Sequence, residues 1–467
     1  MDLRPSHILQ AGSHCDSGQI VTITASDGLP NIAGYAPGTD VVEHSEIDLD
    51  QDVMAVQPSG TGDDGMGGDF SALTAAYTEG GNSVKGSGAI RTLRGFSTGL
   101  DGKACPGSAD GNDVSTCIEP MFANQKAYWG TGSYGNDIVT AALEGSGDYD
   151  GKADILRKEV AVKGSAYMVA GMYAIHEMED AVLDCGADGA ASDAGVHAWD
   201  EAVAFYAGSL EGPDAGGASA GELSYRLAEK RCANYGTCTG EGGISQVNAN
   251  IMTAFDAGKA ALATGDCDAG AVQMDIIKKQ MLVPLVQGTL RYAYKADPAR
   301  ENPDSSPEKE IGEGWAFAIA ILGEVNSCDA DTANMLRTNM DIAADSAVAD
   351  GYAAVVSGLQ STYSCLGITC DDVGGLVSDA GSSAGCYSSS THQCDCESSA
   401  DTCTDYWVNE GCRSCITTSY YPGHEPCSGD GSDICTLQND GNGDGVVNVV
   451  DLLALLGDFG CTCGGCN

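Results

Sequence analysis

Oxygen-bearing side chains recur at alternating positions in a glycine-rich stretch near the end of the chain. The ligands it offers are Asp440, Asn442, Asp444, the backbone carbonyl of Val446, Asn448 and Asp451. Calcium is held by about six to eight oxygens, which a twelve-residue loop of this kind supplies. Gly445 permits the sharp turn, and a Leu-rich helix follows. The spacing therefore predicts a Ca²⁺ site, against the alternative of a plain Gly/Asp turn before a helix.

Histidines and acids form a second set of potential ligands in the middle of the chain. They are His176, Glu177, Glu179 and Asp180, followed by His197, Asp200 and Glu201. Residues three and four positions apart share a helix face, so several of these acids extend an apolar stripe. Buried carboxylates need partners, and His and carboxylate groups are suitable iron ligands. The alternatives are a core histidine bonded to a glutamate, and acids that offset a helix dipole.

A Glu-x-x-Glu pair, Glu310 and Glu313, adds two carboxylates one helical turn apart. We include both residues among the candidate iron ligands, although such a pair is a weak pattern by itself. Cys232 and Cys238 lack the His and the partner spacing of a zinc site, so we interpret them as a disulfide pair.

The composition limits the possible partners and the compartment. The 467 residues include 22 Lys and Arg against 67 Asp and Glu, which gives a formal net charge of −45. Such a field attracts cations and disfavours nucleic acid, whose binding depends on basic contacts to phosphates. The 21 cysteines indicate an oxidising, secreted environment. No apolar run is long enough to cross a membrane.

The elements that must position these ligands are helices. Ala-rich, helix-permissive segments alternate with Gly/Asp turns from residue 70 onward, with helices expected at 70–79, 136–144, 153–183, 196–210, 221–235, 245–263, 270–296, 307–325 and 329–360. We predict an all-α fold in four parts. These are a loosely ordered lead-in over 1–68, a helical-bundle domain over 69–376, a Cys-rich, loop-rich module over 377–436 and a single calcium loop with its helix over 437–467.

The helical domain contains a weak internal repeat, over about 153–235 and 245–360. Each unit has a long helix, a polar loop and a shorter helix. In each shorter helix an acid precedes a phenylalanine by four residues: Glu201 and Phe205 in the first, Glu313 and Phe317 in the second. We therefore expect a duplicated bundle.

Several stretches resemble the algal iron-assimilating family, also described as low-iron-inducible periplasmic proteins. The resemblance covers about residues 70–375 and is carried by 77–86, 91–98, 197–212, 230–232, 284–294 and 313–318. It implies a secreted, periplasmic or extracellular protein associated with iron acquisition. Glu-x-x-Glu patterns have been proposed to bind iron in this family, and Glu310 with Glu313 matches them. The stretch from Gly171 to Glu179 is more distantly similar to the imelysin-like family.

The tail is similar to a dockerin-type calcium loop, which resembles an EF-hand loop with Asp in its last position. Dockerins have two such repeats, whereas only one is present here. The single repeat argues against recruitment to a cohesin partner.

We consider three functions. The first is a non-enzymatic protein that binds Fe²⁺ or Fe³⁺ at the cell surface and passes it to a transporter or reductase, with the calcium-binding tail attached to a wall or matrix component. The second is a calcium-stabilised structural or adhesive matrix protein. The third is a metal-dependent or dockerin-borne hydrolase, which the absence of a complete catalytic constellation in the sequence disfavours. Iron stoichiometry separates the first two, because a matrix protein would bind many cations loosely.

Overall fold

The chain folds into packed helices in the computed structural model, which describes residues 28–56, 69–108, 112–188, 193–239, 243–299, 307–344 and 346–376. In this part of the chain, backbone pairing outside helices and turns is limited to three isolated bridges. The all-α class expected from the sequence is confirmed. The calcium loop and the Cys-rich stretch lie outside the described residues.

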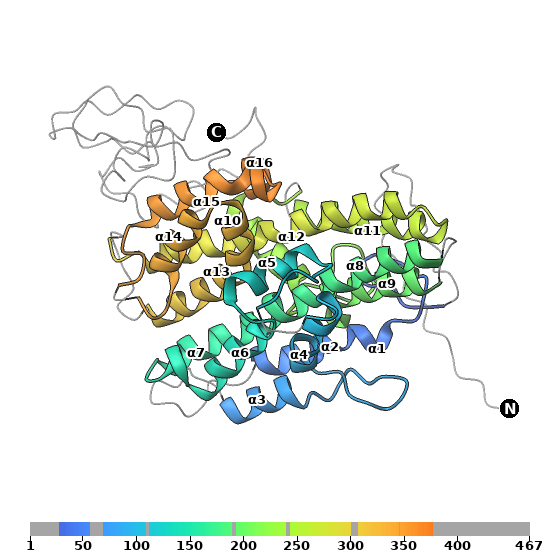
Figure 1. The fold of residues 1–467 in the computed structure, drawn as a ribbon, viewed down its shortest axis with the longest axis horizontal. Helices are drawn as coiled ribbons and strands as arrows, with labels where there is room; N and C mark the ends of the chain where they lie inside the picture. Colours follow the sequence, from blue (N-terminus) through green and yellow to red (C-terminus); the bar gives the residue numbers. More distant parts are fainter. Residues whose placement is uncertain are drawn as a thin grey trace, which may run out of the picture.

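The helices follow one another along the chain (Figure 1). They are α1 (Val42–Ser45), α2 (Ile47–Val56), α3 (Phe70–Thr78), α4 (Leu93–Ala104), α5 (Pro120–Trp129), α6 (Tyr134–Glu144), α7 (Asp154–Lys163), α8 (Gly171–Asp188), α9 (Asp193–Ala207), α10 (Ser224–Tyr235), α11 (Gln246–Ala263), α12 (Cys267–Ala296), α13 (Glu308–Cys328), α14 (Ala330–Met340), α15 (Tyr352–Leu366) and α16 (Cys370–Val373), with short η1 (Gly147–Tyr149) and η3 (Ser209–Glu211).

Two helix pairs form the frame of the molecule. Helix α8 packs against α9, and α12 packs against α13, while α11 contacts both α9 and α12. In Figure 1, α8, α9 and α11 lie at one end of the molecule and α13, α14 and α15 lie at the other. One continuous apolar core runs through these helices and includes Trp199, Phe255 and Ile319.

Helices α7 and α8 are joined without a break by a π-helical segment, η2 (Gly164–Ala170). Its residues are mostly buried, and it contacts α4, α6 and α13 as well as its two neighbours. Single π turns inside α-helices are uncommon and are frequent at functional sites.

The part of the lead-in that the structure describes is ordered and buried, which differs from the loose segment that we predicted for residues 1–68. Ile47 and Met54 of α2 are fully buried, and Tyr35 is 1 % exposed. Apolar residues spaced about seven apart place one face of this acidic segment against the core. Residues 28–56 are therefore a structural part of the helical unit.

Beyond the lead-in, α4 and α5 were also not expected from the sequence. Helix α4 contains three glycines, each of which disfavours helix by about 1 kcal/mol relative to Ala. Packing outweighs this propensity, because Leu93, Phe96 and Leu100 are buried on one face. The Thr92 side chain also accepts a hydrogen bond from the backbone of Gly95, which caps the helix.

The single helix that we predicted over 329–360 is divided into α14 and α15. The Asn339 side chain donates to Asp350, and the Asp350 backbone N–H donates back to the Asn339 amide oxygen at 2.8 Å. This side-chain pairing closes a turn, and Gly351 follows with φ +82°. The Ala-rich composition predicted helix here, but these contacts favour the turn.

Four disulfides connect the described cysteines: Cys105–Cys117, Cys185–Cys267, Cys232–Cys238 and Cys328–Cys365. The pairing of Cys232 with Cys238 that the sequence suggested is confirmed. Cys185–Cys267 links the end of α8 to the start of α12, and Cys328–Cys365 links α13 to α15. These bonds fit an oxidising compartment. A search of the described helices for a segment long and apolar enough to cross a membrane found none.

Candidate metal centre

Two histidines and a glutamate converge where α1 meets α9. Glu201 Oε1 lies 2.7 Å from His44 Nε2 and 3.0 Å from His197 Nε2. One ligand atom from each residue falls within 4.8 Å of the others. His197 and Glu201 are four residues apart on α9 and share a face, whereas His44 arrives from α1, more than 150 positions earlier in the chain.

Hydrogen bonds behind the cluster fix the orientation of its ligands. The Thr39 hydroxyl is 2.9 Å from His197 Nδ1 and donates to Asp200 Oδ2 at 2.8 Å. Tyr35 also donates to Asp200, at 2.5 Å. Such second contacts direct the other ring nitrogen of a histidine toward a metal. Here they direct Nε2 of His197 toward Glu201.

The electrostatics of the cluster favour an ionised glutamate. Burial raises the pKa of Glu201, but hydrogen bonds and charge from His197 and His44 outweigh it and hold that pKa well below its usual range. The hydrogen bond to Glu201 in turn raises the pKa of His197, against the effect of burial. The carboxylate is thus available as an anionic ligand.

His44 and Glu201 border a polar cavity of about 320 Å³, which we call the Glu201 pocket, while His197 contacts Glu201 from outside its lining. Tyr173 and Glu177 of α8 line it together with His44 and Glu201, and Phe96 and Lys103 come from α4. Burial raises the pKa of Glu177 to about 7, and the negative charge of Glu201 adds to the effect. Two carboxylates that repel each other across a cavity provide a place that a cation would stabilise.

A basic side chain also enters the Glu201 pocket. The Arg91 guanidinium contacts His44 Nε2, the same nitrogen that faces Glu201. A metal ion bound through that nitrogen requires the Arg91 side chain to withdraw. Arg91 therefore competes with a cation for this position.

A second group of potential ligands lies on α8, beside the cluster of His44, His197 and Glu201. His176, Glu177 and Asp180 each offer an atom within 4.8 Å of the others. His176 Nδ1 is 2.6 Å from Glu119 Oε1, while its Nε2 is buried and has no hydrogen-bond partner among the described residues. Burial lowers the pKa of His176, but Glu119 outweighs it and the net shift is upward. Glu177 belongs to this group and also lines the Glu201 pocket.

The remaining predicted ligands are engaged elsewhere. Glu179 is paired with Lys278, and Asp200 is fully buried with both oxygens hydrogen-bonded to Tyr35 and Thr39. Lys295 is 2.8 Å from Glu310, and Lys163 is 2.8 Å from Glu313.

The Glu-x-x-Glu carboxylates are thus neutralised by lysines, and neither joins a ligand group in the part of the chain that the structure describes. The calcium candidates Asp440, Asn442, Asp444, Val446, Asn448 and Asp451 lie outside that part.

The sequence did not reveal His44 or Glu119. His44 falls in the segment that we expected to be loosely ordered, and the two ligands that it joins, His197 and Glu201, are more than 150 positions away in the sequence. The available signal was the spacing of Val41, Ile47 and Met54, which marks a buried helix face with His44 beside it.

The chain thus combines an all-α, disulfide-bonded fold with a candidate metal centre of histidines and carboxylates. It belongs to the family of low iron-inducible periplasmic proteins, whose sequence pattern matches residues 14–397. The match extends beyond residues 70–375 at both ends and includes the segment that contributes His44. The family description places the chain in the periplasmic space. No curated protein and no solved structure matched the chain.

Proposed function

We propose that this protein binds iron in the Glu201 pocket and assists iron acquisition at the cell surface without catalysing a reaction. The observation that carries the proposal is the convergence of His44 and His197 on Glu201, which lines the cavity together with His44. Two histidines and one carboxylate form a donor set that suits non-haem iron. The membership of the family supports the same role, since its members are induced by low iron.

In this proposal the residues around His44, His197 and Glu201 adjust the iron affinity so that binding is reversible. Glu177 also lines the cavity and is placed to supply a further carboxylate. Arg91 occupies the cation position until iron displaces it, which limits the affinity. The formal charge of −45 raises the local cation concentration around the molecule. A transporter or reductase at the cell surface would then take up the released iron.

The test compares two glutamates at the same place in the predicted repeat. Iron content and affinity are measured for Fe²⁺ and Fe³⁺ on the full, disulfide-bonded chain with calcium saturated. We expect one or two irons per chain in the parent protein. Glu201→Gln keeps the size of the side chain but removes its charge, and we expect at least a tenfold weaker affinity. Glu313→Gln is the matched control and should leave iron affinity unchanged.

Either of two results would contradict the proposal. Iron retained at full affinity in Glu201→Gln would move the site elsewhere, and loss in Glu313→Gln instead would point to the Glu-x-x-Glu pair. Calcium bound without iron above background would favour the matrix-protein alternative.

We propose separately that the tail binds one Ca²⁺ and attaches the protein to a wall or matrix component. The support is the spacing of Asp440, Asn442 and Asp444 in the sequence. Calorimetry of the full chain with CaCl₂ tests it, with Asp444→Ala expected to abolish one binding event. Asp430→Ala, in the Cys-rich stretch, is the control. Equal calcium binding in Asp444→Ala would reject the assignment.

A further inference from the structure

A second polar cavity, of about 340 Å³, opens between α7, α10, α12 and α13 and is bordered by Gln51 of α2. We call it the Arg231 pocket. Its basic lining residues are Lys158, Lys163, Lys230, Arg231 and Lys309, and its acidic ones are Glu159, Glu222 and Glu313. Acids outnumber bases threefold in the whole chain, so the excess of bases here is a local reversal of charge.

Arg231 is buried in this pocket, and two of its three nitrogens have no hydrogen-bonding partner among the described residues. Arg231 is 7 % exposed, and the described residues provide no acceptor for its Nε or Nη1. A buried, unsatisfied donor costs roughly 1–3 kcal/mol, and more when it is charged. A guanidinium in this state is therefore a site for an acceptor that the protein itself does not supply.

Aromatic rings position the guanidinium. Its carbon lies 5.7 Å from the ring centroid of Tyr292 and 5.8 Å from that of Phe317. Phe317 is stacked between Tyr292 and Tyr167, with interplanar angles of 12° and 16°. The rings hold the planar group by cation–π contact.

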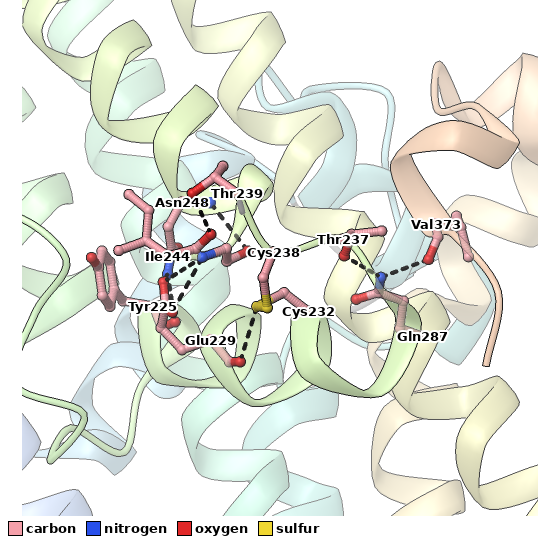
Figure 2. The surroundings of a disulfide bond; sticks show 11 residues. Tyr225, Glu229, Cys232, Thr237, Cys238, Thr239, Ile244, Asn248, Gln287 and Val373 are labelled. Atoms are coloured by element: carbon pink, nitrogen blue, oxygen red, sulfur yellow. Dashed lines mark hydrogen bonds between the residues drawn. A yellow bond between two sulfur atoms is a disulfide. The ribbon is translucent and has the colours of Figure 1, made fainter. Parts of the chain in front are cut away.

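The helix that carries Arg231 is anchored on three sides. Cys232, the residue after Arg231 in the sequence, forms a disulfide with Cys238, and the Glu229 side chain accepts from Asn248 of α11 at 2.6 Å (Figure 2). Tyr235 donates to the backbone carbonyl of Gln287 in α12 at 2.7 Å. Rigid support of this kind preorganises a binding group and reduces the entropy that a ligand must overcome.

The other charges do not satisfy Arg231. Glu313 and Glu159 are both paired with Lys163. Glu222 lies 3.8 Å from Lys230. Burial and repulsion from neighbouring bases, Arg231 among them, lower the pKa of Lys230. An anion in the cavity would relieve this repulsion as well as accept from Arg231.

We propose that the Arg231 pocket binds a small oxyanion-bearing molecule, a carboxylate or a phosphate, with Arg231 as its principal contact and Lys230 and Lys309 at the rim. The fork of N–H groups on arginine matches the oxygens of both anions. The volume suits a small organic molecule and is at the lower end for such pockets. The pocket shares no lining residue with the Glu201 pocket, so this proposal does not depend on iron binding.

The experiment is isothermal titration of the full, disulfide-bonded, metal-free chain with inorganic phosphate and, separately, with citrate, in chloride buffer. We expect saturable binding of at least one of them, with a stoichiometry of one. Arg231→Gln should weaken it tenfold or more, as expected for losing hydrogen bonds to a charged group. Arg94→Gln makes the same charge change at an exposed position on α4, outside the pocket lining, and should bind as the parent does.

A second variant keeps the test valid if Arg231→Gln does not fold. Lys309→Gln changes an exposed rim residue, and we expect a two- to fivefold loss. Binding of phosphate alone assigns a phosphate ligand, and binding of citrate alone assigns a carboxylate. Absence of saturable binding of both anions at millimolar concentration, or equal binding in the parent, Lys309→Gln and any folded Arg231 variant, overturns the proposal.

Discussion

The Glu201 pocket and the Arg231 pocket are built on the same local pattern and differ in the partner of one glutamate. In the first, Glu201 on α9 lies one turn before Phe205, whose ring is 5.5 Å from that of Tyr173 on α8. In the second, Glu313 on α13 lies one turn before Phe317, whose ring is 5.7 Å from that of Tyr292 on α12. Histidines meet Glu201, whereas a lysine meets Glu313.

The residue before each glutamate accounts for this difference. Asp200 accepts hydrogen bonds from Tyr35 and Thr39. It therefore holds the segment that leads to His44 beside the Glu201 pocket. Gly312 occupies the corresponding place, and a Cβ there would meet the Leu156 carbonyl oxygen at 2.6 Å. The glycine thus lets α13 approach α7, which brings Lys163 to Glu313. One position selects which segment of the chain completes each pocket.

The largest effect on iron affinity is expected from replacing His44 and His197. In the double variant His44→Ala/His197→Ala, iron affinity should fall about 100-fold or more, because two of the three converging ligands are lost. Equilibrium dialysis with Fe²⁺ and Fe³⁺ measures it. Glu310→Gln, which alters a residue paired with Lys295, serves as the control and should bind iron normally. An unchanged iron affinity in the double variant would show that the histidines beside Glu201 do not make its pocket different from the Arg231 pocket in iron binding.

The next prediction concerns Asp200 and Gly312, the residues that directly precede Glu201 and Glu313, and their separate effects on stability and iron binding. Asp200→Ala leaves three donors, the Tyr35 hydroxyl and the backbone N–H and hydroxyl of Thr39, without this acceptor, and we expect the free energy of unfolding to drop by about 2–4 kcal/mol together with weaker iron binding. Gly312→Ala should destabilise by roughly 1–3 kcal/mol through overpacking, with iron affinity unchanged. Urea denaturation and iron titration are measured on both. Equal losses of iron affinity would show that Asp200 has no special role in placing His44.

A smaller effect, of opposite sign, is expected at Arg91. Arg91→Gln removes the positive charge that contacts His44, so iron affinity should rise by about tenfold. Arg94→Gln, on α4 and outside the pocket lining, is the matched control. A loss of affinity in Arg91→Gln would mean that Arg91 supports the bound state instead of competing with the metal.

The smallest effect concerns pH and contrasts two acids on α13. Lys163 lowers the pKa of Glu313 although burial opposes it. Glu324 has no such dominant partner, and burial raises its pKa to about 7, with Glu179 adding to the effect and Asn124 and Lys278 opposing it. The native state then holds this proton more tightly than the unfolded state does. The stability contributed by this group is complete below pH 4.5 and is lost as the pH rises through 7.

Glu324→Gln should therefore stabilise the protein by on the order of 1 kcal/mol at pH 8 and have little effect near pH 4.5. Thermal unfolding at both pH values checks this difference, with the exposed Glu144→Gln as the control. A constant difference across this pH range would show that Glu324 is ionised throughout.

The sequence predicted the helices that carry periodic apolar residues and the ligands that share a helix face. His176 with Glu177 and Asp180, and His197 with Glu201, are each four or fewer positions apart, so helical geometry alone brings them together. His44 and Glu119 reach these groups only through tertiary packing. Sequence spacing contains no information about that packing, and the same limit applies to Lys163 and Glu313. The internal duplication and the domain boundaries stay predictions.

The π-helical segment Gly164–Ala170 has a consequence for both pockets. It connects α7, whose Lys163 faces the Arg231 pocket, to α8, whose Tyr173 and Glu177 face the Glu201 pocket. A π turn contains one residue more than an α turn, and each α-helical residue advances the helix by about 100°. Deleting one residue from this segment would rotate one pocket wall out of phase with the other. The number of residues in η2 therefore sets the angle between the two pocket walls, in addition to the packing of its own buried side chains.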